Sequence, residues 1–191
     1  TLAAMLLSGC AGEETSGGLI DTEKGATGED AAARLAPEFR DIGAAVAVLQ
    51  PTDGHAVRGT VLFYQRGDSV QVVADVAGLE PGTRHGFHVH AFGDLTAPDG
   101  SHAGGHYDPD HHDHGLPPQT PRHAGDLGNL EADQRGHAHR ELTVGNISVA
   151  GRRNPVLGRA VIVHARPDEG SQPAGDAGRR LAQGVIGVAV I

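Results

Sequence analysis

The sequence predicts an all-β domain, built as a β-sandwich or a closed barrel. Gly is abundant, with 29 in 191 residues, whereas Trp is absent and there are only four Phe and two Tyr. Short β-branched runs alternate with turn residues, which is typical of a sheet with many tight turns. The length suits one domain with a substantial core.

Seven segments are predicted to form strands. The first two read as a hairpin because Pro51, Asp53 and Gly54 lie between them. The stretch 91–121 has no periodicity and is too long to be an idle connection, so it is expected to carry function. The predicted strands are Ala45–Leu49, Gly59–Tyr64, Val70–Val76, Gly86–His90, Ile147–Val149, Arg159–His164 and Val185–Ile191, with a further exposed strand or hairpin around His137 and His139.

The amino-terminal part is expected to contain an export signal and a flexible tether. Residues 1–10 read as the remnant of a signal peptide, residues 11–43 as a flexible tether, and residues 44–191 as the folded domain. The segment Leu7-Ser8-Gly9-Cys10 resembles a bacterial lipobox, in which Cys10 becomes lipidated. We therefore expect an exported protein of the cell envelope, anchored to a membrane through Cys10. An unmodified cysteine in a processed leader is the alternative.

The net charge of −9 argues against nucleic acid as a partner, since a phosphate backbone requires a basic face. Histidine is the informative residue type. There are thirteen, and nine of them lie between His85 and His123. Imidazole is the commonest metal-ligating side chain. The single cysteine, Cys10, lies far from this cluster, so the sequence predicts a metal site without thiolate ligands.

Two kinds of metal site are indicated by the spacing. His88 and His90 are two apart on a predicted strand, so their rings leave the same face, and His164 ends another strand. A set of three or four imidazoles suits copper(II). Three loop histidines and a carboxylate form a plausible tetrahedral zinc site, from His106, His114, His123 and Asp126.

The motifs GFHVH, AGGHYDP, RHAGDLGN, GRAVIVHA and GDAGRRLAQGVIG resemble the signature blocks of the copper-zinc superoxide dismutases. The resemblance extends over residues 44–191. It implies a Greek-key β-barrel of about eight antiparallel strands with long metal-binding and electrostatic loops. It also implies that the protein converts superoxide to oxygen and hydrogen peroxide, with copper cycling between two oxidation states and zinc in a structural role.

The resemblance also implies a role for each site residue. Asp168 would hydrogen-bond one histidine of each metal site. Arg180, beside the open face of copper, and His106, as a proton carrier, would be catalytic. The implied copper ligands are His88, His90, His106 and His164, and the implied zinc ligands are His106, His114, His123 and Asp126. His85 would be structural, and a homodimer is possible.

The sequence departs from the family's pattern where a disulfide is usual. The loop 95–101 is one residue longer than usual, and Gln183 stands where the second half-cystine is expected. Other contacts must therefore hold this loop near Arg180. With fewer cations than usual, attraction of the substrate is expected to depend on Arg166, Arg179 and Arg180.

Two other functions are compatible with the same fold, because a fold does not determine an activity. One is a non-enzymatic domain that binds copper and zinc or delivers copper, and such a domain could lack Arg180. The other is a structural adhesion module, which has no need of seven metal ligands. The sequence assigns no role to His55, His102, His111, His112, His137 and His139.

Overall fold

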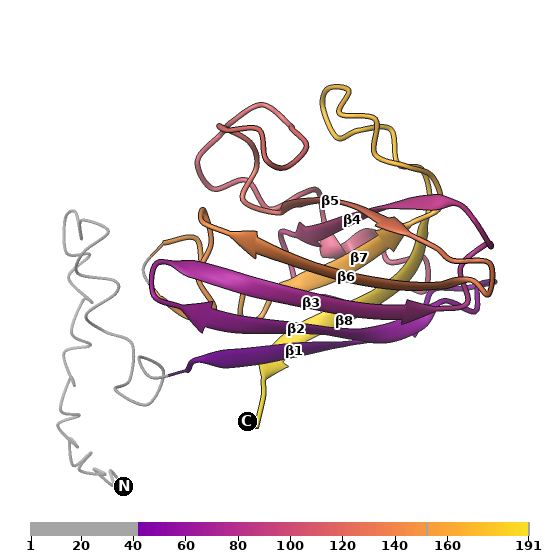
Figure 1. The fold of residues 1–191 in the computed structure, drawn as a ribbon, viewed down its shortest axis with the longest axis horizontal. Helices are drawn as coiled ribbons and strands as arrows, with labels where there is room; N and C mark the ends of the chain where they lie inside the picture. Colours follow the sequence, from indigo (N-terminus) through magenta and orange to yellow (C-terminus); the bar gives the residue numbers. More distant parts are fainter. Residues whose placement is uncertain (1–41, 152, 191) are drawn as a thin grey trace, which may run out of the picture. The chain divides into compact units, whose positions relative to one another are not determined.

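The computed structural model describes residues 42–151 and 153–190, so Cys10 and residues 11–41 of the expected tether lie outside the described residues. The described chain forms one eight-stranded sheet in the order β5-β4-β7-β8-β1-β2-β3-β6, in which all neighbours are antiparallel (Figure 1). The strands are β1 Ala44–Pro51, β2 Arg58–Arg66, β3 Ser69–Ala77, β4 Arg84–His90, β5 Asp126–Glu131, β6 His137–Val144, β7 Ala160–His164 and β8 Arg180–Val188.

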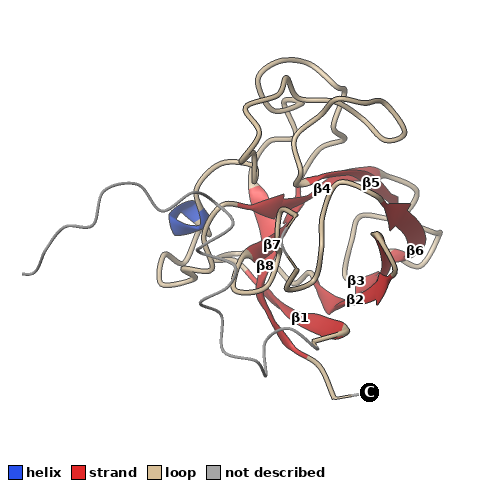
Figure 2. Cartoon of the chain, turned by 90° about the vertical axis from the view of Figure 1, so that its left-hand side faces the viewer, coloured by secondary structure: helices blue, strands red, loops and turns tan. Residues whose placement is uncertain are grey.

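The sheet curls into a nearly closed barrel, and Figure 2 shows its strands curving around a common interior. This confirms the predicted all-β, Greek-key barrel class. The described residues contain one short 3₁₀ helix, η1 (Ser101–Ala103). None of their helices is long and apolar enough to cross a membrane.

The core follows from period-two alternation on the strands that face solvent. In β3, Val70, Val72, Ala74 and Val76 are buried, and the residues between them are more exposed. Strand β7 is instead buried throughout, as is β4 after its first residue. These two strands are covered on their outer face as well, where Ala103, Ala160 and Ile162 form a second, smaller apolar cluster. Strands β4 and β7 are therefore buried on both faces, and the histidines of β4 that point outward are shielded from solvent.

Three strand predictions need correction. Ile147 and Val149 are buried in the core, but residues 147–149 form only an isolated bridge, between Ser148 and Pro155. Three backbone hydrogen bonds join residues 148 and 149 to residues 154–157, but they do not extend into a strand. Strand β5 was not predicted, because Asp126 and Asn129 interrupt its apolar run. Strand β8 begins at Arg180 rather than at Val185 because polar residues at its start continue the pairing with β7.

Two long connections emerge on the same side of the barrel, above β4 in Figure 1. One joins β4 to β5 and the other joins β7 to β8. His114 and Gln172 fasten them together, since the backbone N–H of His114 donates to Gln172 Oε1 (3.0 Å) and Gln172 Nε2 donates to the His114 carbonyl (2.8 Å). The two connections are thus held over the same part of the sheet.

Candidate metal centre

Histidine rings from separate elements converge in two groups that share His106. Within each group the potential ligand atoms all lie within 4.8 Å of one another. The groups are His88, His90, His106 and His164, and His106, His114, His123 and Asp126. The structure therefore brings together the same seven residues that the sequence analysis assigned to copper and to zinc.

The first group has its rings fixed from outside. His90 Nδ1 donates to the Gly104 carbonyl (2.8 Å), and His164 Nδ1 donates to the Gly178 carbonyl (3.1 Å). A carbonyl can only accept, so these bonds place the ring proton on the outer nitrogen. The free lone pairs then lie at the two Nε2 atoms, which are 3.2 Å apart. The buried His88 Nδ1 has no hydrogen-bond partner. Such inward lone pairs are what a metal requires.

The protonation of this group also fits copper. Burial lowers the pKa of His88 to about 4 and that of His164 to about 3. Burial also holds the pKa of His90 well below its ordinary value. These rings are therefore neutral at neutral pH, which is the form of imidazole that coordinates a metal.

The second group fits a tetrahedral zinc site. Asp126 Oδ1 lies 2.9 Å from His106 Nδ1, 3.0 Å from His114 Nδ1 and 3.3 Å from His123 Nδ1. Metal–ligand bonds of about 2.0–2.1 Å in a tetrahedron would place neighbouring ligand atoms about 3.3 Å apart. Despite these short distances, the Nδ1 atoms of His114 and His123 make no hydrogen bond. They point at a common centre rather than at Asp126.

Backbone N–H groups hydrogen-bond the second carboxylate oxygen of Asp126. Asp126 Oδ2 accepts hydrogen bonds from the N–H groups of Gly115 (3.0 Å) and His123 (3.1 Å), which leaves Oδ1 for a metal. Burial would raise the pKa of Asp126, but the nearby rings of His106 and His114 and the hydrogen bond from the Gly115 N–H hold it well below the ordinary value. The carboxylate is therefore ionised, as a zinc ligand must be.

Asp168 connects the two groups, as the resemblance implied. Its carboxylate accepts from His88 Nε2 (2.8 Å) through one oxygen and from His114 Nε2 (2.9 Å) through the other. Asn129 holds Asp168 in place, since the Asp168 N–H donates to Asn129 Oδ1 (2.7 Å) and Asn129 Nδ2 donates to the Asp168 carbonyl (3.0 Å). The sequence analysis missed Asn129. Its signal was a lone amide between the apolar residues Leu127 and Leu130.

Arg180 reaches the first group from the start of β8. A cavity of about 530 Å³ over that group is lined by Arg180, His90, His106 and His164, and by part of the β7–β8 connection. The guanidinium donates to the carbonyls of Gly100 and Gly104. A fixed positive group thus stands beside three of the converging rings, where an anion could enter.

The other two arginines contribute less than the sequence suggested. Arg166 pairs with Asp176 (2.5 Å). Because Asp176 also lines the cavity, much of the Arg166 charge is cancelled there. Arg179 lines an adjacent cavity together with Asp53 and Asp99. Attraction of an anion to the first group therefore depends mainly on Arg180.

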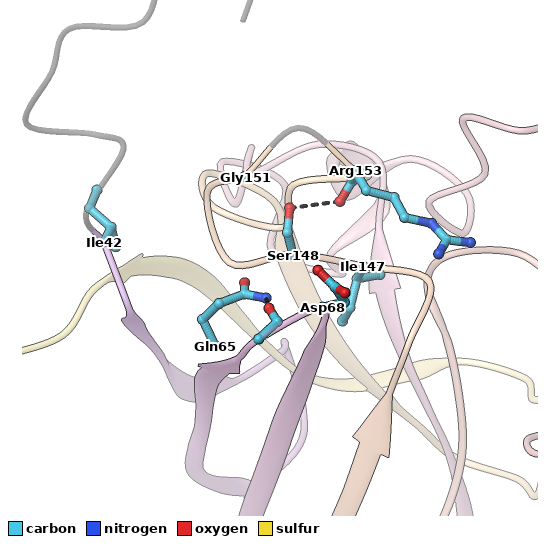
Figure 3. A pocket seen from close by; sticks show the side chains of 8 residues that line it. Ile42, Gln65, Asp68, Ile147, Ser148, Gly151 and Arg153 are labelled. Atoms are coloured by element: carbon cyan, nitrogen blue, oxygen red, sulfur yellow. Dashed lines mark hydrogen bonds between the residues drawn. The ribbon is translucent and has the colours of Figure 1, made fainter.

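The remaining histidines lie apart from the two groups. His85 Nδ1 donates to the His164 carbonyl (2.9 Å), which agrees with a structural role. His139 lies on β6 and bonds Asp75 (2.8 Å) across the strand pair. A further cavity has a volume of about 520 Å³. It lies beside the β2–β3 turn and residues 147–151, and Arg153 also lines it (Figure 3). No residue of either histidine group lines it, so it is not part of the metal centre.

Comparison with known proteins agrees with this geometry. The family model described as "Copper/zinc superoxide dismutase (SODC)" matches residues 57–186. A curated relative, "Superoxide dismutase [Cu-Zn] 2" of Brassica juncea, is 45% identical over 156 residues, which are 77% of this chain and 99% of that protein. The solved structure "Crystal Structure Analysis of the clock protein EA4" is similar with a TM-score of 0.69 and 37% identity, over 77% of this chain and 95% of that chain.

We predict that chelation strongly destabilises the protein, because the second group draws its side chains from a long connection that the metal would tie together. Zinc held at 1,000 times its dissociation constant stabilises the folded state by about 4 kcal/mol. For a chain of this size the expected fall in Tm on chelation is about 8–16 °C. Calorimetry of metal-loaded and chelated protein measures it.

The matched control for chelation is His123→Ala, which removes the most exposed ring of the second group. Added zinc should raise its Tm far less than that of the unaltered protein. Equal Tm values for loaded and chelated unaltered protein would contradict a structural zinc site.

Proposed function

Because the chain belongs to the copper/zinc superoxide dismutase family, we propose how its own residues perform the dismutation of superoxide. Two superoxide anions and two protons become one oxygen and one hydrogen peroxide. Bound copper supplies the chemistry by taking an electron from one superoxide and giving it to another, and zinc has a structural role. The observation that carries the proposal is the pair of converging groups that share His106, with Arg180 in the cavity above them.

We assign copper to the neutral, buried group of His88, His90, His106 and His164, and zinc to the group that contains the ionised Asp126. His106 Nδ1 lies 2.9 Å from Asp126 Oδ1, so Nε2 is the ring nitrogen that remains available for a proton. His106 also lines the cavity. It is thus suited to take up a proton at Nε2 and to pass it to the reduced substrate.

Arg180 is assigned the capture of superoxide. The substrate is a small monoanion with little surface to recognise, so charge must provide most of its attraction. A guanidinium about 5 Å away attracts it by roughly 3 kcal/mol at an effective dielectric constant near 20, before screening by salt. A domain that only stores or delivers copper has no need of this charge, so its position beside the rings favours the enzyme.

We predict that Arg180→Ala lowers the catalytic rate constant about tenfold or more, because part of that attraction is lost. Arg180→Glu should be slower still, since it repels the substrate, whereas Arg180→Lys should retain much of the activity. Copper and zinc contents should stay near those of the unaltered protein. Superoxide consumption is measured on metal-replete protein at several salt concentrations, and salt should slow the unaltered enzyme more than Arg180→Ala. Full activity of Arg180→Glu would refute the assignment.

We further propose that Cys10 carries a lipid that anchors the enzyme to a membrane of the cell envelope. The support is the sequence Leu7-Ser8-Gly9-Cys10, which follows a short apolar run and contains the chain's sole cysteine. Two or more acyl chains hold firmly, since each buried methylene contributes about 0.8 kcal/mol. The protein expressed in a bacterium that lipidates such motifs should partition into detergent, and Cys10→Ala should stay in the aqueous phase. Aqueous partitioning of both would refute the anchor.

We also propose that the enzyme is a homodimer that pairs through its β1–β8 surface, defined here as Val48, Phe92, Val185 and Val188. These side chains are 57%, 61%, 39% and 57% exposed, respectively. The strands β1 and β8 are paired, and a Cβ on Gly93 would contact Val185 at 3.4 Å, so Phe92 adjoins them. Two chains of net charge −9 repel each other, and this uncharged surface is where they can meet with the least repulsion.

We expect sedimentation of the full chain to give the mass of two copies, and Val48→Glu or Val188→Glu to give one copy. A twofold interface contains each introduced charge twice, so the effect of one substitution is doubled. Thr143→Glu on β6, three strands from β1, is the control and should remain dimeric. A monomeric unaltered protein, or a dimer in both valine variants, would refute this surface.

A further inference from the structure

The guanidinium of Arg180 is only as well placed as the loop that accepts its hydrogen bonds. Its two acceptors, the carbonyls of Gly100 and Gly104, flank η1 in the connection after β4. Arg180 itself is half-buried between this loop and β8. A shift of the loop therefore moves the positive charge relative to the histidine rings below it.

Part of this loop is fixed by the two residues that follow β1. The Asp53 N–H donates to the Pro98 carbonyl (2.8 Å). Thr52 Oγ1 donates to the Arg180 carbonyl (2.6 Å), and the Thr52 N–H donates to the Leu181 carbonyl (3.0 Å). The Asp53 bond holds the turn at Pro98, and the Thr52 bonds hold the backbone at the start of β8. None of these bonds is made to Ala97 or to Gly100, whose carbonyl accepts from Arg180.

Gln183 is the side chain that reaches this turn from within the sheet. It is 7% exposed and lies opposite Ile162, on the covered outer face. Its Nε2 donates to the Ala97 carbonyl through a long bond of 3.5 Å. A Cβ on Gly100 would lie 3.1 Å from Gln183 Oε1 and 3.2 Å from Arg180 Cδ. The amide therefore supports the Ala97–Gly100 turn from below and packs where Arg180 passes.

Burying a glutamine here lowers the stability of the folded protein, so a functional reason for its amide is expected. Its Oε1 has no hydrogen-bond partner, and an unpaired buried acceptor typically costs about 1–3 kcal/mol. An apolar side chain of similar length would avoid that cost, but it would leave the Ala97 carbonyl without this donor. The polar choice is explained if the position of the turn matters more than local stability.

We propose that Gln183 is a positioning residue for Arg180. Through the turn Ala97–Gly100 it holds the Gly100 carbonyl, and through that carbonyl it holds the guanidinium over the histidine rings. Its amide does without covalent chemistry what a cross-link between strand and loop would do. The inference rests on the proposed role of Arg180 in anion capture.

The test compares Gln183→Met with Gln65→Met in the full, metal-loaded chain. Gln65 is a matched control on β2: it donates to the carbonyls of Gly67 and Ser69 and accepts from Val149, far from Arg180 in sequence and beside a different cavity. Both changes remove an amide from a semi-buried or buried site. If Gln183 contributed only to stability, both variants should lower Tm and leave anion binding and the rate constant unchanged.

Three readouts separate the variants. Hydrogen exchange at the Gly100 amide, which donates to Ala97 (2.9 Å), should speed up about tenfold or more in Gln183→Met alone. Azide, a small monoanion, titrated spectroscopically against the copper(II) protein, should bind about threefold more weakly. The rate constant for superoxide should fall by about threefold to tenfold at unchanged metal content. Gln65→Met should lower Tm without changing the three readouts.

A double-mutant cycle shows whether the effect passes through Arg180. Gln183→Met should change azide affinity little further when Arg180 is already alanine, because the positioned group is gone. Equal further losses in both backgrounds, or unchanged exchange at Gly100 in Gln183→Met, would overturn the proposal. If Arg180→Ala alone leaves azide binding intact, the role of Arg180 fails, whereas the exchange measurement still judges the contact between Gln183 and the turn.

Discussion

The carboxylate of Asp168 is the contact on which the rest of the metal centre depends. It is 1% exposed and accepts one ring nitrogen from each histidine group. One of these rings, His88, lies on β4, and the other, His114, lies in the long connection after it. Asn129 fixes Asp168 from β5. Four segments far apart in the chain are thereby registered against each other, and the rings are oriented before any metal arrives.

The two groups achieve opposite electrostatic states with similar side chains. Burial among other imidazoles keeps His88 and His164 neutral. Beside Asp126 and Asp168, burial again opposes charge on His114, but the two carboxylates outweigh it and raise its pKa to about 9. The first group thus offers neutral nitrogen ligands, which suits a redox-active ion. The second adds one anionic ligand, Asp126, which suits a fixed divalent cation that displaces the proton of His114 on binding.

Much of this was predictable from local patterns. The alternation GFHVH determines that His88 and His90 share a face, and the apolar run before His164 marks a strand. The motifs of the loops supplied the remaining ligands by resemblance. Contacts between distant segments left no such pattern. Nothing near Gln183 shows that its amide meets Ala97, and β5 was hidden because Asp126 and Asn129 serve the site rather than the apolar period. The strand predicted at residues 147–149 was wrong because buried apolar side chains such as Ile147 and Val149 also occur in segments that are not strands.

The glycine carbonyls that orient His90 and His164 have a consequence for how freely this chain can vary. Gly104 and Gly178 adopt φ angles of 76° and 79°, which favour glycine. A Cβ on Gly104 would lie 2.7 Å from the Phe92 ring, and one on Gly178 would lie 2.9 Å from Arg166 Nε. Neither glycine is a candidate ligand, yet a side chain there would strain the backbone whose carbonyl orients a metal-facing ring. Mutational tolerance in this protein is therefore set by which backbone atoms hold the rings, and distance from the metal is a poor guide to it.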